Sequence, residues 1–479
     1  MNIKKIRESV QSCRSDIIAD AKKLISYPST EGEEKPGRPF GEKVNACLEE
    51  TLQIADKLGL KSENIDGYAG TVELGNGEDI LGILCHLDVV PAGEDWNYPP
   101  FTGVIEDGKL YGRGALDNKG PAVGAMYAMK IVKELGIELN KRVRLILGTN
   151  EESGFGGINY YSENEEVPDL AFSPDAVFPV IHAEKGIVVF NLVSHFSAAA
   201  GSENNNENVK NRVEIIELEG GTAPNMVPDR CRAKLRGDEE LLSRQIEKYV
   251  NNKGIKFKLD EGDHFLHLTC HGVSAHGSKP RDGKNAISHL IQFLGELNIK
   301  ENALSRFCHN YRRLIGLDYH GKKMGCDRSD DISGRLVFNV GQIKADLEKA
   351  RVTVNIRYPV ESDMEKIYDD ISKAIDNPGW KLEKQQHKKP LFLEKDDPLV
   401  SSLMEVYSQV TGESAEPLAI GGGTYARAVP KAVAFGPLFP GEPELAHQKD
   451  EYIEIDSLLE NIVIYAGAII ALASSEDLK

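Results

Sequence analysis

Two adjacent glutamates, Glu151 and Glu152, directly follow the apolar stretch "VRLILGTN" (143–150). This stretch is typical of a buried strand, so both carboxylates are expected where that strand ends. Neighbouring side chains in an extended chain point to opposite sides, and two adjacent carboxylates repel each other. A solvated acidic loop is one interpretation. The other is that one carboxylate binds a metal ion while the other transfers a proton beside it.

Further acids and histidines follow predicted strands, or precede a predicted helix, elsewhere in the chain. They are His86 and Asp88 after "DILGILC", Asp117 in "GRGALDNKGP", Asp175 after "DLAFSP" and His447 after "KAVAFGPL". Ligands of open α/β sheets bind beyond the carboxyl ends of the strands, so these distant segments can meet there. Two imidazoles with several carboxylates form a mixed nitrogen and oxygen set, which suits zinc, manganese or cobalt and differs from a thiolate site.

Each of these residues also has an ordinary interpretation. A single histidine such as His86 after a strand is commonly just a polar residue, but Asp88 shares its face and could orient the imidazole, as carboxylates beside metal-bound histidines do. Asp117 could cap the helix predicted to begin at Pro121. Asp175, in "SPDA", could be a turn residue. The case for a metal site therefore depends on the five segments together.

The elements that must position these residues form an α/β pattern. Up to about residue 184, short apolar runs alternate with helical patterns such as 121–136, in which Pro121 lies in the first turn. The pattern returns after residue 389. We expect a mixed, mostly parallel sheet with helices on both faces, formed by residues 1–184 and 389–479.

The middle of the chain, 185–388, has a different organisation. Residues 212–237 and 335–359 each predict a strand, a turn and a second strand, and each is followed by a helical stretch and a short strand. Aligning Arg236 with Arg357 gives an offset of 121 residues (357 − 236). We therefore expect an inserted α+β lid domain made of two related modules. The polar segment 201–211 is expected to be an exposed loop.

Composition narrows the class of protein. A chain of 479 residues with 41% hydrophobic and 28% charged residues predicts a soluble protein of two or three domains. The formal net charge of −18 argues against nucleic acid or an anionic membrane as the main partner. Seven scattered cysteines without a CxxC motif favour a reducing cytoplasm.

Both ends of the sequence predict helices. The first 25 residues have no apolar core typical of a signal peptide and predict one amphipathic helix. Its apolar stripe consists of Ile6, Val10, Ile17, Ile18 and Leu24. The apolar segment 462–473 is shorter than the roughly 20 residues of a membrane span, so it predicts a buried helix.

Several segments carry a resemblance to a known family. They are "CHLDVVPAGEDWNYPPF", "GRGALDNKGP", "TNEESGFGG", "SPDA" and "HGVSAHGSKP". They resemble the aminoacylase/carboxypeptidase family of dinuclear metallopeptidases over nearly the whole chain. The long insertion and "GGGTYAR" are similar to the peptidase V type of bacterial dipeptidase.

The resemblance implies two divalent metal ions, with zinc preferred over manganese or cobalt. Asp117 would bridge the two ions, and the peptide bond that follows it, to Asn118, would be cis. Glu151 would act as general base toward a metal-activated water. The implied ligand set is His86, Asp117, Glu152, Asp175 and His447.

The resemblance, for His276 and Asn225, and the residue types, for Arg357 and the glycines, suggest roles outside the ligand set. His276 would stabilise the tetrahedral oxyanion, although a surface loop is its ordinary interpretation. Arg357 would clamp a substrate carboxylate, although strand arginines commonly form surface ion pairs. Asn225 matches a substrate-contacting asparagine. Gly422 and Gly423 would bring backbone groups close to the substrate.

The function expected is hydrolysis of unblocked dipeptides by a cytoplasmic metallopeptidase. An amide hydrolase acting on N-acyl amino acids uses the same chemistry and stays open. A catalytically inactive binding protein on this fold is the alternative of another class. A nucleotide site in "IGGGTYAR" (420–427) is disfavoured because the segment lacks the GK[ST] ending of a P-loop. Because both modules lie in one chain, we expect a monomer.

Overall fold

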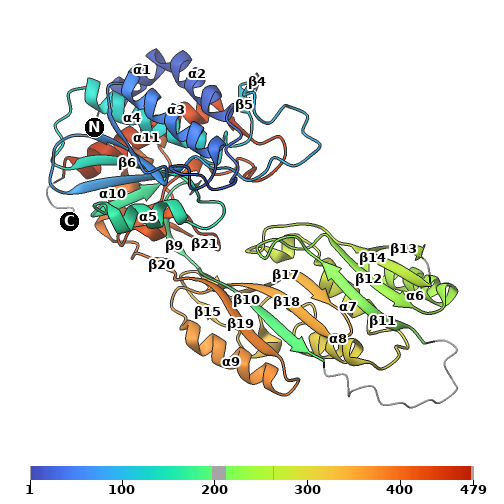
Figure 1. The fold of residues 1–479 in the computed structure, drawn as a ribbon. Coiled ribbons are helices and arrows are strands. Elements are labelled where there is room, and N and C mark those ends of the chain that lie inside the picture. Colours follow the sequence, from blue (N-terminus) through green and yellow to red (C-terminus); the bar gives the residue numbers. More distant parts are fainter. Residues whose placement is uncertain (1, 197–211, 263, 476–479) are drawn as a thin grey trace. The chain divides into compact units, whose positions relative to one another are not determined.

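The computed structural model describes residues 2–196, 212–262 and 264–475, which divide into two compact units (Figure 1). The first unit consists of residues 1–183 and 391–479, and the second of residues 184–390. These boundaries lie within two residues of those expected from the sequence. The predicted exposed loop 201–211 lies outside the described residues.

The first unit contains a nine-stranded mixed sheet. Its central strands, β6, β3, β7 and β22, are parallel, and antiparallel strands extend the sheet at both edges. The strand order is β1 (Lys61–Ile65), β2 (Ala69–Leu74), β6 (Arg142–Gly148), β3 (Ile80–His86), β7 (Leu170–Ser173), β22 (Ala432–Ala434), β9 (Ile181–Glu184) and β20 (Leu391–Phe392), with β21 (Leu418–Ile420) beside β9.

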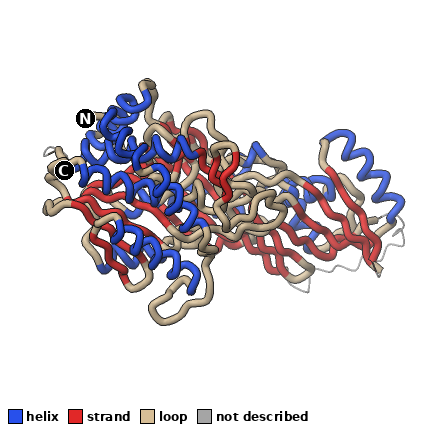
Figure 2. Tube along the Cα trace, turned by 90° about the horizontal axis from the view of Figure 1, so that it is seen from above, coloured by secondary structure: helices blue, strands red, loops and turns tan. Residues whose placement is uncertain are grey.

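Helices cover both faces of this sheet, as predicted (Figure 2). Alternate strand residues point to opposite faces, so Ile83 of β3 packs in a larger core and Leu84 in a smaller one. The larger core is built on α3 (Glu42–Lys57), α4 (Lys119–Glu134), α10 (Pro398–Thr411) and α11 (Ile455–Ala473), and the smaller on α5 (Gly156–Asn164) and the 3-10 helix η4 (Tyr425–Ala428).

Two helix starts differ from the sequence expectation. Helix α4 begins at Lys119 rather than Pro121, which is tolerated because the proline still lies in the first turn, where its missing N–H is not needed. The N-terminal helix is split into α1 (Ile3–Ser12) and α2 (Arg14–Ile25), because Cys13 leaves helical geometry and its N–H bonds to Val10. Ile18 is only partly buried, unlike the rest of the predicted stripe.

The last helix, α11, is the described helix long and apolar enough to cross a membrane. Within the molecule, 72% of its apolar window is buried. It packs against α4 and α10 in the larger core, so the predicted buried helix is confirmed.

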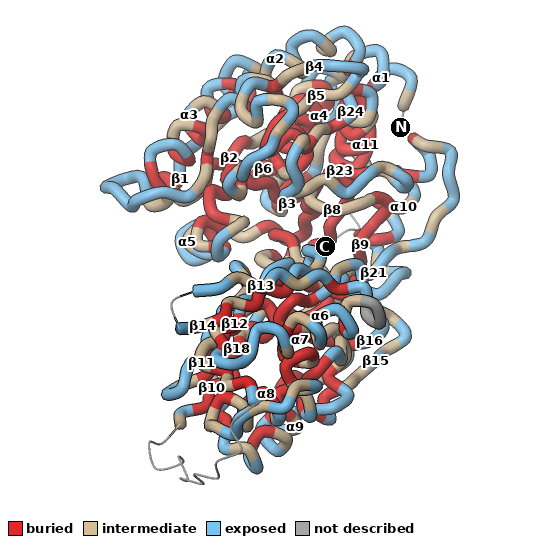
Figure 3. The backbone as a smooth tube through the Cα atoms, turned by 90° about the vertical axis from the view of Figure 1, so that its right-hand side faces the viewer, coloured by how far each residue is buried: buried red, intermediate tan, exposed pale blue. Residues whose placement is uncertain are grey.

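The second unit is built on an eight-stranded sheet, and buried residues line its inner strands (Figure 3). The first module consists of β11 (Glu214–Gly220), β12 (Arg230–Arg236), α6 (Glu239–Lys253) and β13 (Lys256–Gly262), with β14 (Phe265–His271) between β13 and β12. The second consists of β17 (Val337–Ala345), β18 (Lys349–Tyr358), α9 (Met364–Asp376) and β19 (Lys381–Lys388), with β10 (Gly186–His195) between β19 and β18. Two helices, α7 (Ala286–Leu294) and α8 (Ala303–Leu314), complete the unit.

The two modules meet where β11 pairs antiparallel with β17. From this central pair outward, the strand order is the same on each side, β12-β14-β13 and β18-β10-β19. The repeat seen in the sequence therefore corresponds to two halves of one continuous sheet.

Candidate metal centre

The five predicted ligands gather beyond the carboxyl ends of the central strands of the first unit. His86 is the last residue of β3 and lies beside Gly148, the last residue of the parallel strand β6. The glutamate pair follows β6, and Asp175 stands two residues after β7. Neighbouring parallel strands thus end at one edge, which brings together residues that are far apart in the sequence.

Asp117 lies at the centre of this cluster. Its Oδ1 is 2.9 Å from Nε2 of His86, and its Oδ2 is 3.2 Å from Nε2 of His447. Helix α4 has Asn118 rather than Asp117 at its N-cap, so the capping interpretation of Asp117 is wrong. The Asp117–Asn118 peptide bond is cis, as the resemblance implied.

Each of the remaining two carboxylates lies near one of the imidazoles. Oε2 of Glu152 lies 2.9 Å from Nε2 of His447. Oδ1 of Asp175 lies 3.7 Å from Nε2 of His86 and accepts a hydrogen bond of 3.2 Å from Nδ2 of Asn118. The His447 side chain is 41% exposed, whereas that of Glu152 is 8% exposed. The centre is therefore buried on one side and accessible at His447.

The electrostatics of the cluster reflect crowded carboxylates. Burial and the nearby Asp117 raise the pKa of Glu152 to about 7. Burial lowers the pKa of His447, but hydrogen bonds to Asp117 and Glu152 outweigh it and raise that pKa to about 11. Burial also lowers the pKa of His86, and the surrounding aspartates raise it well above its usual value. The carboxylates thus favour the protonated, positively charged form of both imidazoles.

The donor set fits a divalent cation. Ligand atoms of His86, Asp117 and Glu152 all lie within 4.8 Å of one another. Imidazole nitrogen with carboxylate oxygen is a ligand combination used for zinc and for other first-row metals. A cation here would replace protons as the partner of the carboxylates.

Asp88 has a different contact from the one expected. Nδ1 of His86 lies 2.9 Å from the backbone oxygen of Asp88, while the Asp88 carboxylate is farther away, at 3.6 Å. That carboxylate accepts hydrogen bonds from the backbone N–H groups of Glu151 (2.9 Å) and Glu152 (3.0 Å). The backbone of Asp88 therefore orients the imidazole, and its side chain holds the glutamate pair in place. Sequence spacing could not separate these two contacts.

Glu151 lies next to the cluster. Burial raises its pKa well above the usual value, and Asp175 and Glu152 raise it further against the opposing effect of His86. A partly buried carboxyl with a raised pKa is typical of groups that exchange protons in active sites.

The glycine loop lies in the same unit. It connects β21 to η4, and the backbone oxygen of Gly422 accepts a hydrogen bond of 3.0 Å from Arg427. Gly423 is partly buried, like Gly422. Tyr425, directly after the loop, places its ring centroid 6.2 Å from that of His86.

The other predicted site residues lie in the second unit. His276 is exposed, with Nδ1 2.6 Å from Oγ of Ser278. The backbone oxygen of Asn225 accepts a hydrogen bond of 2.6 Å from Gly277, the residue after His276. Asn225 and His276 are therefore neighbours within this unit.

Arg357 belongs to a buried polar row on the same sheet. It is 5% exposed, and its Nε donates to Oδ1 of Asn355 at 2.8 Å. Asn355 is paired in register with Asn339, whose Nδ2 donates to the backbone oxygens on either side of Asn225. Sequence reasoning missed Asn355, although its spacing of two from Arg357 places both on one face of β18.

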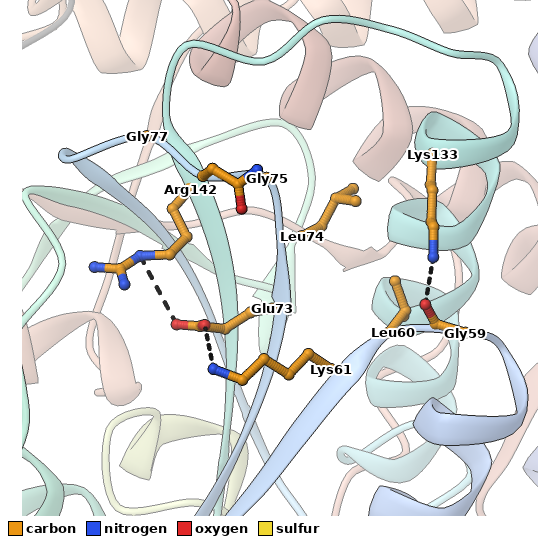
Figure 4. A pocket seen from close by; sticks show the side chains of 10 residues that line it. Gly59, Leu60, Lys61, Glu73, Leu74, Gly75, Gly77, Lys133 and Arg142 are labelled. Carbon is orange, nitrogen blue, oxygen red and sulfur yellow. Dashed lines mark hydrogen bonds and ion pairs between the residues drawn. The ribbon is translucent and has the colours of Figure 1, made fainter.

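A separate pocket of about 480 Å³ lies in the first unit (Figure 4). Arg142, which lines it, begins β6, so the pocket is at the opposite end of that strand from the glutamate pair. Within it, Glu73 lies 3.6 Å from Lys61 and 3.8 Å from Arg142. Lys61 and Arg142 are thus already close to a carboxylate, and Lys133 donates a hydrogen bond to the backbone oxygen of Gly59. None of the predicted ligands lines the pocket.

Comparison with known proteins gives consistent results. The family model described as "Peptidase family M20/M25/M40" matches residues 82–471. A Bacillus subtilis protein named "Putative dipeptidase YtjP" is 40% identical over 468 residues, which is 96% of this chain and 98% of that protein. The Staphylococcus haemolyticus "Putative dipeptidase SH1171" is 37% identical over 473 residues, covering 97% and 99%.

Among solved structures, the di-peptidase Dug1p of Saccharomyces cerevisiae has a similar fold. The TM-score is 0.59 at 14% sequence identity, and the match covers 99% of each chain. At this identity the likeness concerns the fold alone.

Proposed function

Because the chain belongs to peptidase family M20/M25/M40, we propose that it is a metal-dependent dipeptidase that hydrolyses the peptide bond of unblocked dipeptides. One observation carries the proposal. Two imidazoles and three carboxylates gather beyond the sheet beside the partly buried carboxyl of Glu151. The names of the two bacterial relatives support a dipeptide as the substrate.

The proposed cofactor is a pair of divalent ions, with zinc preferred and manganese or cobalt as alternatives. Bound there, the ions would supply Lewis acidity that acidifies a water molecule and polarises the scissile carbonyl. Asp117, with each oxygen directed at a different imidazole, is the proposed bridging ligand. The proposed ligands are His86, Asp117, Glu152, Asp175 and His447.

The proton transfers are assigned to Glu151. It would take a proton from the attacking water and then deliver it to the leaving amine. Asp88 would keep this carboxyl in place through the backbone N–H of Glu151. The raised pKa of Glu151 suits the role because the group must gain and lose one proton in each turnover.

Residues of the second unit are proposed to recognise the substrate. Arg357 would pair with the free carboxylate of the dipeptide, and Asn225 would contact the substrate. His276 would stabilise the oxyanion of the tetrahedral intermediate. Gly422 and Gly423 of the first unit would approach the substrate with their backbone groups. The neighbouring positions of Asn225 and His276 support their joint role.

A cytoplasmic monomer is proposed as the working form. Six of the seven cysteines are buried thiols, which is compatible with a reducing compartment. The two modules of the lid domain are joined through β11 and β17, which supports a lid that needs no second subunit.

The test is a panel of unblocked dipeptides and N-acetyl amino acids, assayed with metal-stripped and metal-restored protein. We expect hydrolysis of dipeptides only after metal is restored. Preference for N-acetyl amino acids would instead identify the chain as an N-acyl-amino-acid amide hydrolase. No hydrolysis of either class by the metal-restored protein would favour a binding protein.

A further inference from the structure

The side chain of Glu451 binds the segment that leads to Asp117. It is 0% exposed. Its Oε1 accepts hydrogen bonds from the backbone N–H groups of Gly114 (3.0 Å), Leu116 (2.9 Å) and Asp117 (3.1 Å). Its Oε2 accepts a hydrogen bond of 2.6 Å from Nη1 of Arg113. All four donors therefore lie within five consecutive residues that end at Asp117.

The backbone around Glu451 ties the same two loops together. The N–H of Gly112 donates to its backbone oxygen at 2.8 Å. Strand β24 (Tyr452–Glu454) begins at the next residue and pairs antiparallel with β5 (Lys109–Tyr111). His447 stands four residues before Glu451. One buried side chain thus connects the loops that carry Asp117 and His447.

Burying an ionised carboxylate is unfavourable unless charged and hydrogen-bonding partners compensate. Here one partner, Arg113, is itself 2% exposed and supplies the charge. The other three are backbone donors, which fix the path of the main chain rather than the position of a mobile side chain. These hydrogen bonds hold the backbone of Asp117, a proposed metal ligand, in one position.

We infer that Glu451 is a positioning residue for the metal centre, which acts by holding Asp117 and the His447 loop at a fixed separation. The inference rests on the proposed function, in which both residues are metal ligands. Glu451 acts through them and does not touch the substrate.

The test compares Glu451→Gln with Glu454→Gln, which changes an exposed glutamate three residues away. Glutamine keeps one acceptor oxygen, but its amide would face either Arg113 or the three backbone donors. We expect Glu451→Gln to bind Zn²⁺ about 10–100-fold more weakly than the native chain, in competition with a chelator. We expect Glu454→Gln to bind it as the native chain does.

The metal-free proteins are compared by melting temperature, because a purely structural role would lower stability without changing metal affinity. Turnover of Glu451→Gln should recover as Zn²⁺ is raised, with KM unchanged. Zn²⁺ affinity of Glu451→Gln within about twofold of the Glu454→Gln control would overturn the inference.

A second variant guards against misfolding. Glu451→Asp keeps the charge but is one methylene shorter, so it cannot reach all four donors. It should also weaken Zn²⁺ binding, and native affinity in this variant would overturn the inference if Glu451→Gln does not fold. Because affinity is measured without substrate, this result stands even if the chain hydrolyses no dipeptide and the proposed function fails.

Discussion

At the scale of single residues, the division of labour between the two adjacent glutamates is the central feature. Glu152 contacts His447, whereas Glu151 is held next to the cluster through its backbone. One carboxylate is therefore placed among the ligand atoms and the other beside them. We therefore expect a substitution of Glu151 to lower turnover, and a substitution of a proposed ligand to lower metal binding.

Glu151→Ala should lower kcat by about two to four orders of magnitude, the usual contribution of a general base. Its metal content should stay near that of the native chain, because Glu151 is not among the proposed ligands. Turnover and elemental analysis measure the two effects. Glu163→Ala, an exposed change on α5, serves as the control and should alter neither.

His86→Ala should instead lower metal occupancy, because it removes a nitrogen that lies 2.9 Å from Asp117 at the centre of the cluster. Equilibrium dialysis followed by elemental analysis measures this loss. His309→Ala, an exposed histidine on α8, is the control. If Glu151→Ala loses metal and His86→Ala keeps it, the assigned roles are reversed.

At the scale of elements, the end of β6 sets the position of the glutamate pair. Gly148, the last residue of this strand, packs against the buried ring of Tyr425 on η4. A Cβ at Gly148 would overlap both the hydroxyl and the ring of Tyr425. The absence of a side chain therefore lets η4 approach the strand next to the site.

Gly148→Ala should destabilise the first unit by about 1–3 kcal/mol, the usual cost of overpacking a core, and lower the melting temperature by about 2–10 °C. Turnover should also fall, because relief of the clash displaces the end of β6. The control is Gly124→Ala in α4, where the nearest atom to the new Cβ is 3.5 Å away. Equal melting temperatures of the two variants would contradict this argument.

At the scale of the whole molecule, the continuous sheet of the second unit joins two similar modules within one chain. The antiparallel pair of β11 and β17 joins the two modules within the chain. This arrangement is the basis for the proposed monomer, in which His276 completes the site of its own chain.

Mixing His276→Ala with Glu151→Ala protein tests whether sites are shared between chains. We expect no recovery of activity, because each chain would need both residues in its own site. His276→Ala alone should lose mainly kcat, as expected for a contact that strengthens in the transition state. Recovered activity in the mixture, with size-exclusion evidence for a dimer, would contradict the monomer.

The sequence by itself determined the α/β pattern, the two modules and the ligand types. Apolar runs followed by polar residues mark strand ends, as at His86, and this information is local in the chain. Local patterns were less reliable where they depended on a single residue. They did not show that Cys13 divides the first helix or that α4 begins at Lys119.

Only the tertiary structure decided which atoms meet. His86 and Asp88 share a face in the sequence, yet the fold directs the Asp88 carboxylate to the backbone of Glu151 and Glu152. Glu451 carried no signal of its own, because its partners lie 334 to 338 residues earlier in the chain. Side-chain type and spacing are properties of the chain, whereas contacts at such separations are fixed by the pairing and packing of whole elements.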